Sequence, residues 1–119
     1  MINDMMIINN NENVIIITLK GRIQTKSEIY DFESKVRLLK KKNYKKLIID
    51  LKYLDWIGSD GLGALIFCLT SFRNIGGEVF LSNLNDKVKH IFNLTKLDTV
   101  FRIFESTELA IQHHSTISN

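Results

Sequence analysis

The chain has 119 residues, 45% of them hydrophobic, and its 16 Lys and Arg against 13 Asp and Glu give a formal net charge of +3 at pH 7. This length suits one globular domain, so we expect a single domain over residues 1–119, with the tail after about residue 112 left open to disorder. A net charge this small does not indicate nucleic-acid binding. No apolar run approaches the roughly 20 residues of a membrane-spanning helix, and the first residues lack the basic segment of a signal peptide. The lone Cys68 cannot form an intramolecular disulfide, so we expect a cytoplasmic protein without membrane insertion.

The first third of the chain predicts a β-hairpin followed by an amphipathic helix. Two short β-branched runs, residues 5–8 and 14–17, flank a polar stretch and are typical of paired strands. Thr25 and Glu28 have the spacing of a capping box, which starts a helix. The helix should present one apolar face and end in lysines that suit its carbonyl end, and the residues concerned are Ile29, Phe32, Val36, Leu39 and Lys40 to Lys42.

The rest of the chain alternates predicted strands and helices. The continuous apolar run at residues 47–51 is typical of a central strand covered on both faces. This alternation predicts an α/β fold in which amphipathic helices pack on a mixed β-sheet. The later elements are a helix with an apolar stripe from Leu62 to Phe72 that ends before Gly76-Gly77, a strand at 78–82, a helix capped by Asn83 or Asn85, a short strand near 100–103 and a last helix from about Ser106.

Residue types that serve in catalysis are scattered along this sequence. His90 falls on a predicted surface helix, and the adjacent His113 and His114 point in different directions, which suits one metal ion poorly. No spacing brings Ser59, His90 and Asp50 together as a nucleophilic triad. We therefore expect no enzyme activity, no metal and no cofactor.

The segment Gly58-Ser59-Asp60-Gly61 joins a predicted strand to a predicted helix, at the carboxyl end of the strand, where loops commonly carry function. Ser59 or Asp60 could act only as the helix N-cap. The same geometry would also accept a phosphate on Ser59, because free backbone N–H groups and the helix dipole favour an anion. Local chemistry leaves both interpretations open.

Phe67 lies away from the apolar stripe of the helix that follows Ser59. It is therefore either covered by another element or exposed beside that helix. An exposed aromatic ring at this position would suit a partner-binding surface.

Three segments follow one another in a characteristic order. They are the strand at residues 14–19 with Gly21, the stretch LIIDLKYLDWIGSDGLGALI, and the stretch GGEVFLSNLNDKVKHIFNLTKLDTVF. In this order they resemble the STAS domains, a family named for sulphate transporters and anti-sigma factor antagonists. The resemblance covers nearly the whole chain and is strongest from Leu47 to Phe101.

The resemblance implies a non-enzymatic regulator. Anti-sigma factor antagonists of this family bind an anti-sigma factor, often a serine kinase, which phosphorylates a loop serine, and a phosphatase restores binding. Ser59 stands at the position of that serine, so the resemblance implies that Ser59 is phosphorylated. The predicted partner-binding residues are Arg22, Gln24, Gly58, Ser59, Asp60, Gly61, Leu62 and Phe67.

The sequence also departs from the family pattern around Ser59. Gly58 stands where an aspartate is common, Asp60 where a small residue is common, and Arg22 and Gln24 replace acidic residues of a nearby loop. These departures motivate an alternative, a STAS structural subunit of a signalling scaffold or a bacterial transport complex that is not phosphorylated.

Overall fold

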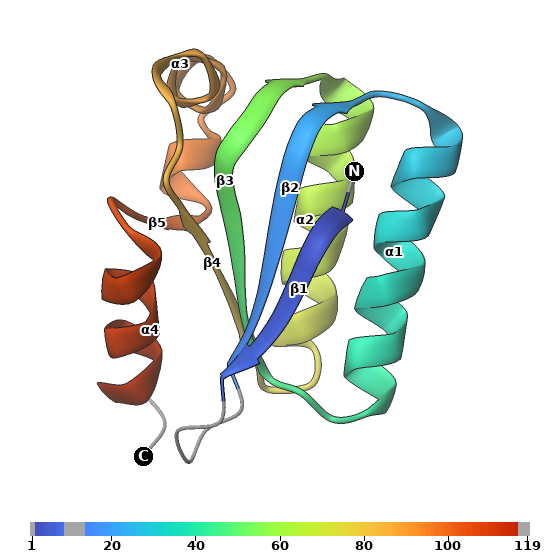
Figure 1. The fold of residues 1–119 in the computed structure, drawn as a ribbon, viewed down its shortest axis with the longest axis vertical. Helices are drawn as coiled ribbons and strands as arrows, with labels where there is room; N and C mark the ends of the chain where they lie inside the picture. Colours follow the sequence, from blue (N-terminus) through green and yellow to red (C-terminus); the bar gives the residue numbers. More distant parts are fainter. Residues whose placement is uncertain (1, 9–13, 117–119) are drawn as a thin grey trace.

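The structure is a computed structural model that describes residues 2–8 and 14–116, with side chains described from residue 14 to residue 114. Its elements form one β-sheet with helices on both faces (Figure 1). The strands are β1 (Ile2–Ile8), β2 (Val14–Ile23), β3 (Lys46–Ile57), β4 (Glu78–Ser82) and β5 (Arg102–Phe104). The helices are α1 (Lys26–Lys41), α2 (Ser59–Arg73), α3 (Asp86–Leu94), the 3₁₀ helix η1 (Leu97–Thr99) and α4 (Thr107–Thr116).

The five described strands lie in the order β1-β2-β3-β4-β5. β1 pairs with β2 in antiparallel fashion, and the other neighbours pair in parallel, with Ile16 opposite Ile48 across β2 and β3. The predicted hairpin and the predicted mixed sheet of an α/β fold are thus confirmed. The connection between β1 and β2, at residues 9–13, lies outside the described residues.

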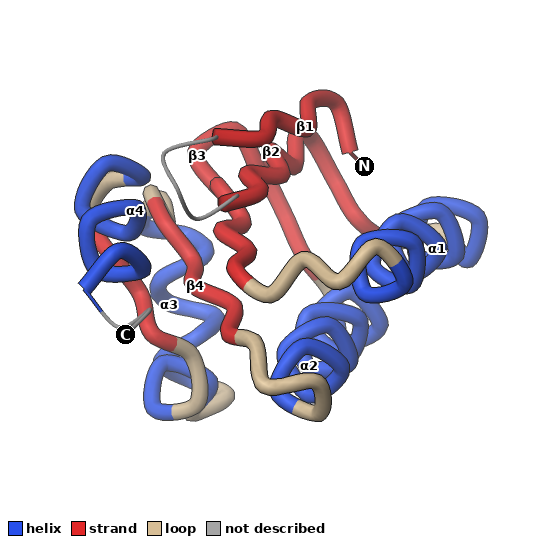
Figure 2. The backbone as a smooth tube through the Cα atoms, turned by 90° about the horizontal axis from the view of Figure 1, so that it is seen from below, coloured by secondary structure: helices blue, strands red, loops and turns tan. Residues whose placement is uncertain are grey.

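The two faces of the sheet are covered unequally (Figure 2). Helices α1, α2 and α3 pack on one face around the main core, which contains Phe32, Leu65 and Phe92. On the other face, α4 packs through Ala110 on a smaller cluster that includes Phe80. Central strand β3 contributes buried side chains to both clusters, as its apolar sequence predicts.

Local signals set the predicted helix boundaries. The capping box of α1 is present, because the Glu28 amide donates to Thr25 Oγ1 at 3.1 Å and the Thr25 amide donates to Glu28 Oε1 at 3.1 Å. Asn85, not Asn83, caps α3. Helix α4 continues to Thr116, and within the described residues no helix has the length and apolarity to cross a membrane.

Strand β3 is longer than the predicted strand at 47–51. Its pairing with β2 shifts twice, so β3 carries extra residues opposite Thr18 to Lys20 and opposite Gly21 to Arg22. As a result Leu51, Leu54 and Ile57 are buried at intervals of three. β4 pairs with β3 only as far as Asp50, so the second half of β3 continues the sheet with β2 alone.

Candidate functional site

Helix α2 begins at the junction of β3 and Gly58, and its cap differs from the sequence-based expectation. Of the two interpretations that local chemistry left open, the one in which Ser59 or Asp60 is the N-cap is wrong. Gly58 is the N-cap, with φ −98° and ψ −175°, and none of the described side chains caps the helix. The Leu62 amide donates to the Gly58 carbonyl at 2.9 Å, so the first turn is closed while the preceding amides have no side-chain acceptor.

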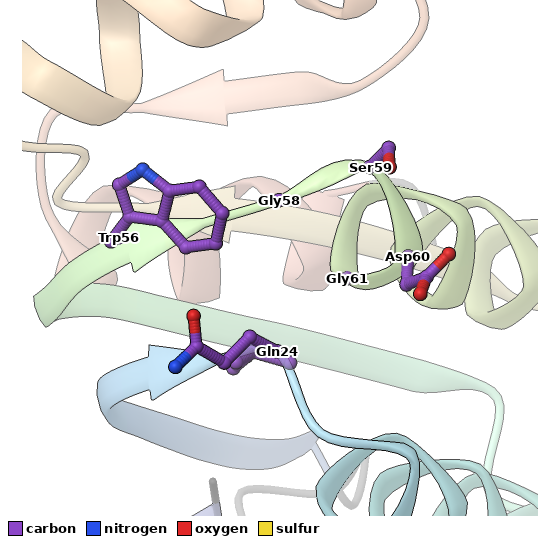
Figure 3. Close-up of a pocket in the computed structure, with 7 residues that line it drawn as sticks. Gln24, Trp56, Gly58, Ser59, Asp60 and Gly61 are labelled. Carbon is purple, nitrogen blue, oxygen red and sulfur yellow. The ribbon is translucent and has the colours of Figure 1, made fainter.

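Ser59 and Asp60 occupy the first turn of α2 as exposed side chains. In Figure 3 the side chains of Ser59 and Asp60 point outward from the start of the helix. Within the described residues neither side chain makes a hydrogen bond. The Ser59 hydroxyl is therefore accessible and uncommitted, beside the positive end of a 15-residue helix.

A small pocket of about 130 Å³ joins the end of β2 to this turn (Figure 3). It brings together five residues of the predicted site, because parallel strands β2 and β3 end at the same edge of the sheet. The lining residues are Ile23, Gln24, Trp56, Gly58, Ser59, Asp60 and Gly61.

Close packing explains the two glycines of this pocket. A Cβ atom at Gly61 would lie 2.7 Å from Ile57 Cγ1 and 3.3 Å from Ile23 Cγ2. A Cβ atom at Gly58 would lie 2.6 Å from the Trp56 ring. The glycines therefore allow the start of α2 to approach the strand ends and the indole closely.

Trp56 and the buried Ile23 are the lining residues that the sequence analysis did not single out. The Trp56 ring lines the pocket and lies under the Arg22 guanidinium, whose Cζ is 5.2 Å from the ring centroid. Arg22 is thereby linked to the pocket, although it does not line it. The three-residue spacing of Leu51, Leu54 and Ile57 was the available signal, because it leaves Trp56 on the outer side of β3.

Leu62 and Phe67, the remaining predicted partner-binding residues, lie outside the pocket. Leu62 is 8% exposed and belongs to the main core. Phe67 is half-buried against the same core, with the Arg37 guanidinium of α1 5.2 Å from its ring centroid. It lies about 12 Å along the helix from Ser59, given a rise of about 1.5 Å per residue. A contact of either residue with a partner stays a prediction.

Charges of both signs surround the pocket. Asp60 lines the pocket and is exposed, and Arg22 is exposed beside the Trp56 ring. Hydrogen bonds from the Thr25 backbone and hydroxyl hold the pKa of Glu28 below its usual value, and the Gln24 amide lies 3.4 Å from Glu28 Oε1. Glu28 is therefore ionised at neutral pH next to the end of β2.

The groups considered for catalysis lie on separate elements. His90 is on α3, His113 and His114 are on α4, and burial in α2 raises the pKa of the Cys68 thiol. Among the described side chains, no three His, Cys, Asp or Glu gather in a way that could hold a metal ion. The accessible chemistry at the α2 junction is thus that of a hydroxyl beside free amides.

A STAS domain model matches residues 5–110. This chain belongs to the STAS family. The match includes both strands that form the pocket, the Gly58 to Gly61 turn and all of α2.

Relatives named as candidate anti-sigma factor antagonists match parts of this STAS chain. A protein of Thermotoga maritima is 31% identical over 71 residues, which span 60% of this chain and 63% of that protein. The protein BtrV of Bordetella bronchiseptica is 24% identical over 99 residues, which span 83% of this chain and 84% of BtrV.

Solved STAS structures share the fold at lower identity. The unphosphorylated anti-sigma factor antagonist SpoIIAA is 17% identical with a TM-score of 0.78, and the match covers 98% of this chain and 100% of SpoIIAA. The phosphorylated form from Bacillus is 15% identical with a TM-score of 0.69, covering 92% of this chain and 98% of that chain. The STAS domain of a SulP transporter from Vibrio cholerae is 19% identical with a TM-score of 0.70, and the match covers 87% of this chain and 80% of that chain. These likenesses show the fold.

Proposed function

We propose that this protein is an anti-sigma factor antagonist that binds an anti-sigma factor with serine kinase activity through the start of α2. Phosphorylation of Ser59 releases the partner, and a phosphatase restores binding. The observation that carries this proposal is the exposed Ser59 hydroxyl, which makes no hydrogen bond among the described residues and begins α2 of a STAS domain. This function requires no catalysis by the chain itself and places the protein in the cytoplasm.

The chemistry of the helix start favours a switch that keeps the fold intact. A phosphate on Ser59 would lie beside uncapped amides and the positive end of the helix dipole, both of which stabilise an anion. The same group would add nearly two negative charges and bulk to a surface that the partner must desolvate. The likeness to SpoIIAA, whose fold is known with and without phosphate, supports this reading.

Phosphorylation is tested by incubating the protein with ATP and its cognate kinase, the anti-sigma factor, and locating the phosphate by mass spectrometry. We expect modification of Ser59, loss of modification in Ser59→Ala and no change in Ser27→Ala. Ser27 is a matched control because it is also an exposed serine in the first turn of a helix, α1. Phosphate elsewhere with Ser59 unmodified would reject the switch.

Partner binding is tested with the same variants by calorimetry. Ser59→Asp should weaken binding of the anti-sigma factor, whereas Ser59→Ala should bind it and resist release by ATP. Equal affinities of Ser59→Asp and the unmodified protein would contradict the proposal.

A second candidate function is a STAS structural subunit of a signalling scaffold or transport complex. Two observations favour it. The STAS domain of the SulP transporter has the same fold, and Gly58 stands where an aspartate is common in the family. A pull-down experiment would support this alternative if the stoichiometric partners include neither a kinase nor an anti-sigma factor. These partners should also bind Ser59→Asp as well as they bind the unmodified protein.

A further inference from the structure

The outer face of β2 and β3, beyond the end of β4, gathers basic and aromatic side chains. The register places Lys20 opposite Tyr53 and Arg22 opposite Trp56. Neighbouring residues paired across two strands project from the same face of a sheet. The extra residues in β3 also turn Lys52 outward, beside Tyr53.

Each aromatic ring of this surface makes a cation–π contact with at least one basic side chain. The Arg22 guanidinium lies 5.2 Å from the Trp56 ring centroid, and the ammonium groups of Lys20 and Lys52 lie 5.5 and 5.6 Å from the Tyr53 ring centroid. Tyr53 is nevertheless 53% exposed and Trp56 38% exposed. We call Arg22, Lys52, Tyr53 and Trp56 the basic-aromatic face.

No described helix covers the basic-aromatic face. α4 packs on the other end of the same side of the sheet, over the cluster of Val14, Ile16, Ile48 and Phe80. Figure 1 shows the upper parts of β2 and β3 extending past α4. Large aromatic side chains left at the surface in this way are typical of the centre of a protein interface.

The basic-aromatic face continues into the Ser59 pocket. Trp56 belongs to both, because its ring carries Arg22 on the outer face and lines the pocket with Ser59. A protein that contacts the start of α2 would therefore meet Trp56 and Arg22 at the rim of the same contact.

We propose that the basic-aromatic face binds an acidic segment of the protein partner that contacts the Ser59 loop. This rests on the proposed function, since it specifies the chemistry of that partner. Arg22 and Lys52 supply the complementary charges. Asp50 and Asp55 are the acidic residues of β3, and the Asp50 carboxylate accepts a hydrogen bond from the Lys52 amide at 3.0 Å. The rings hold the cations in place before binding, which lowers the entropic cost of pairing them with carboxylates.

The charge pattern favours an acidic polypeptide over a nucleic acid. Single-stranded nucleic acids bind to free aromatic faces flanked by a track of cations that follows the phosphates. Here both rings already carry cations, and the whole chain has a net charge of only +3. A short acidic segment matches this limited charge.

The first test uses Trp56, the one tryptophan of the chain, as a fluorescent reporter. The protein is titrated at low salt with a synthetic peptide of ten glutamates and, separately, with a thymidine decamer. We expect the peptide to change Trp56 emission, and the double variant Arg22→Gln/Lys52→Gln to weaken binding by about tenfold or more. Lys41→Gln/Lys42→Gln removes the same charge at the far end of α1 and should bind as the unmodified protein does.

Two results of this titration would overturn the proposal. One is equal peptide response in the unmodified protein and in Arg22→Gln/Lys52→Gln, including no response in either. The other is tighter binding of the thymidine decamer than of the peptide, which would assign the face to nucleic acid. Circular dichroism confirms that the variants are folded.

The second test uses the anti-sigma factor and separates this proposal from the proposed function. Arg22→Gln/Lys52→Gln should weaken its binding and flatten the dependence of affinity on salt. If Ser59→Asp weakens binding and the double variant does not, the basic-aromatic face is rejected alone. If the double variant weakens binding and Ser59→Asp does not, the phosphorylation switch is rejected while the acidic contact stands.

Discussion

The Trp56 ring determines which amino acid fits at position 58. The indole occupies the space that a side chain at Gly58 would need, with ring carbons 2.6 and 2.8 Å from the position of a Cβ atom. Gly58 has an ordinary extended φ of −98°, so its restriction comes from the ring and not from the backbone. The glycine at this position and the tryptophan two residues earlier are therefore one structural feature.

Gly58→Ala should displace Trp56 and thereby change the pocket. We expect a shifted Trp56 emission maximum and a loss of about 1 kcal/mol in the free energy of unfolding, typical of a modest steric conflict. Gly63→Ala is the matched control, since nothing lies within 4 Å of its Cβ position in α2. That control should raise the free energy of unfolding by about 0.5–1 kcal/mol and leave emission unchanged. Unchanged emission in Gly58→Ala would show that the indole does not occupy this space.

At the scale of elements, Asn85 ties α3 to the second half of β3. Its Oδ1 accepts from the Val88 amide at 2.9 Å, and its Nδ2 donates to the Leu54 carbonyl at 2.6 Å. β4 no longer pairs with β3 at Leu54, so this bond supplies a partner for a strand carbonyl that the sheet leaves open. One side chain thus serves both as a helix cap and as an extension of the sheet.

Two substitutions separate these roles of Asn85. Asn85→Asp keeps the capping oxygen and loses the donor to Leu54, whereas Asn85→Ala loses both. We expect urea denaturation to show a loss of about 1 kcal/mol or more for Asn85→Asp and a larger loss, of about 2–3 kcal/mol, for Asn85→Ala. Asn93→Ala, on the same helix, removes only an exposed hydrogen bond to Asp98 at 3.2 Å and controls for asparagine removal. Equal losses in Asn85→Asp and Asn85→Ala would mean that the cap contributes nothing.

Elements with local signals could be predicted, and those shaped by distant contacts could not. The capping box of Thr25 and Glu28 was readable because both partners lie within one turn. The extended β3 was not, because its extra residues break the alternation that identifies a strand and depend on pairing with β2. The cap of α2 was misassigned for a similar reason, since the contact between Trp56 and Gly58 favours a glycine cap over the serine that local preference suggests.

The residues of the candidate site that are placed by strand order could be predicted, and those placed by side-chain packing could not. Gln24 and the turn at residues 58–61 could be placed together, because parallel neighbouring strands end at one edge. Trp56 was not foreseen, because the three-residue spacing of Leu51, Leu54 and Ile57 that indicates its direction departs from the alternation expected of a strand. The position of Phe67 under Arg37 required knowing how α1 packs on α2.

At the scale of the whole molecule, one histidine anchors α4, which among the described helices is the one that covers the second face of the sheet. The His114 ring of α4 stacks on Phe80 of β4, with centroids 3.8 Å apart, and its Nε2 lies 3.2 Å from the Leu47 carbonyl of β3. Its Nδ1 is buried, with no hydrogen-bond partner among the described residues. A neutral imidazole that donates through Nε2 fits this arrangement, whereas an imidazolium would place a second, unpaired N–H in the core.

Burial therefore lowers the pKa of His114 from 6.5 to about 4, opposed by the bond to Leu47 and by Glu78 and reinforced by Lys46 and His113. Because the unfolded chain binds the proton more readily, the free energy of unfolding should fall as pH falls from about 6.5 towards 4, and it should be fully retained above that window. At about 1.4 kcal/mol per pKa unit, the loss at pH 4 amounts to at most about 3 kcal/mol.

His114→Phe tests this coupling between one ionisation and the second face of the sheet. The substitution keeps a ring on Phe80 but removes the proton site, so urea denaturation between pH 4 and 7 should give a flatter dependence on pH than in the unmodified protein. His90→Phe, at an exposed position of α3, should leave the dependence unchanged and accounts for loss of an imidazole elsewhere. Carboxylates that titrate in the same range remain in both proteins, so the difference between the two curves isolates His114. Parallel curves for His114→Phe and the unmodified protein would mean that protonation of His114 does not weaken the packing of α4 on β3 and β4.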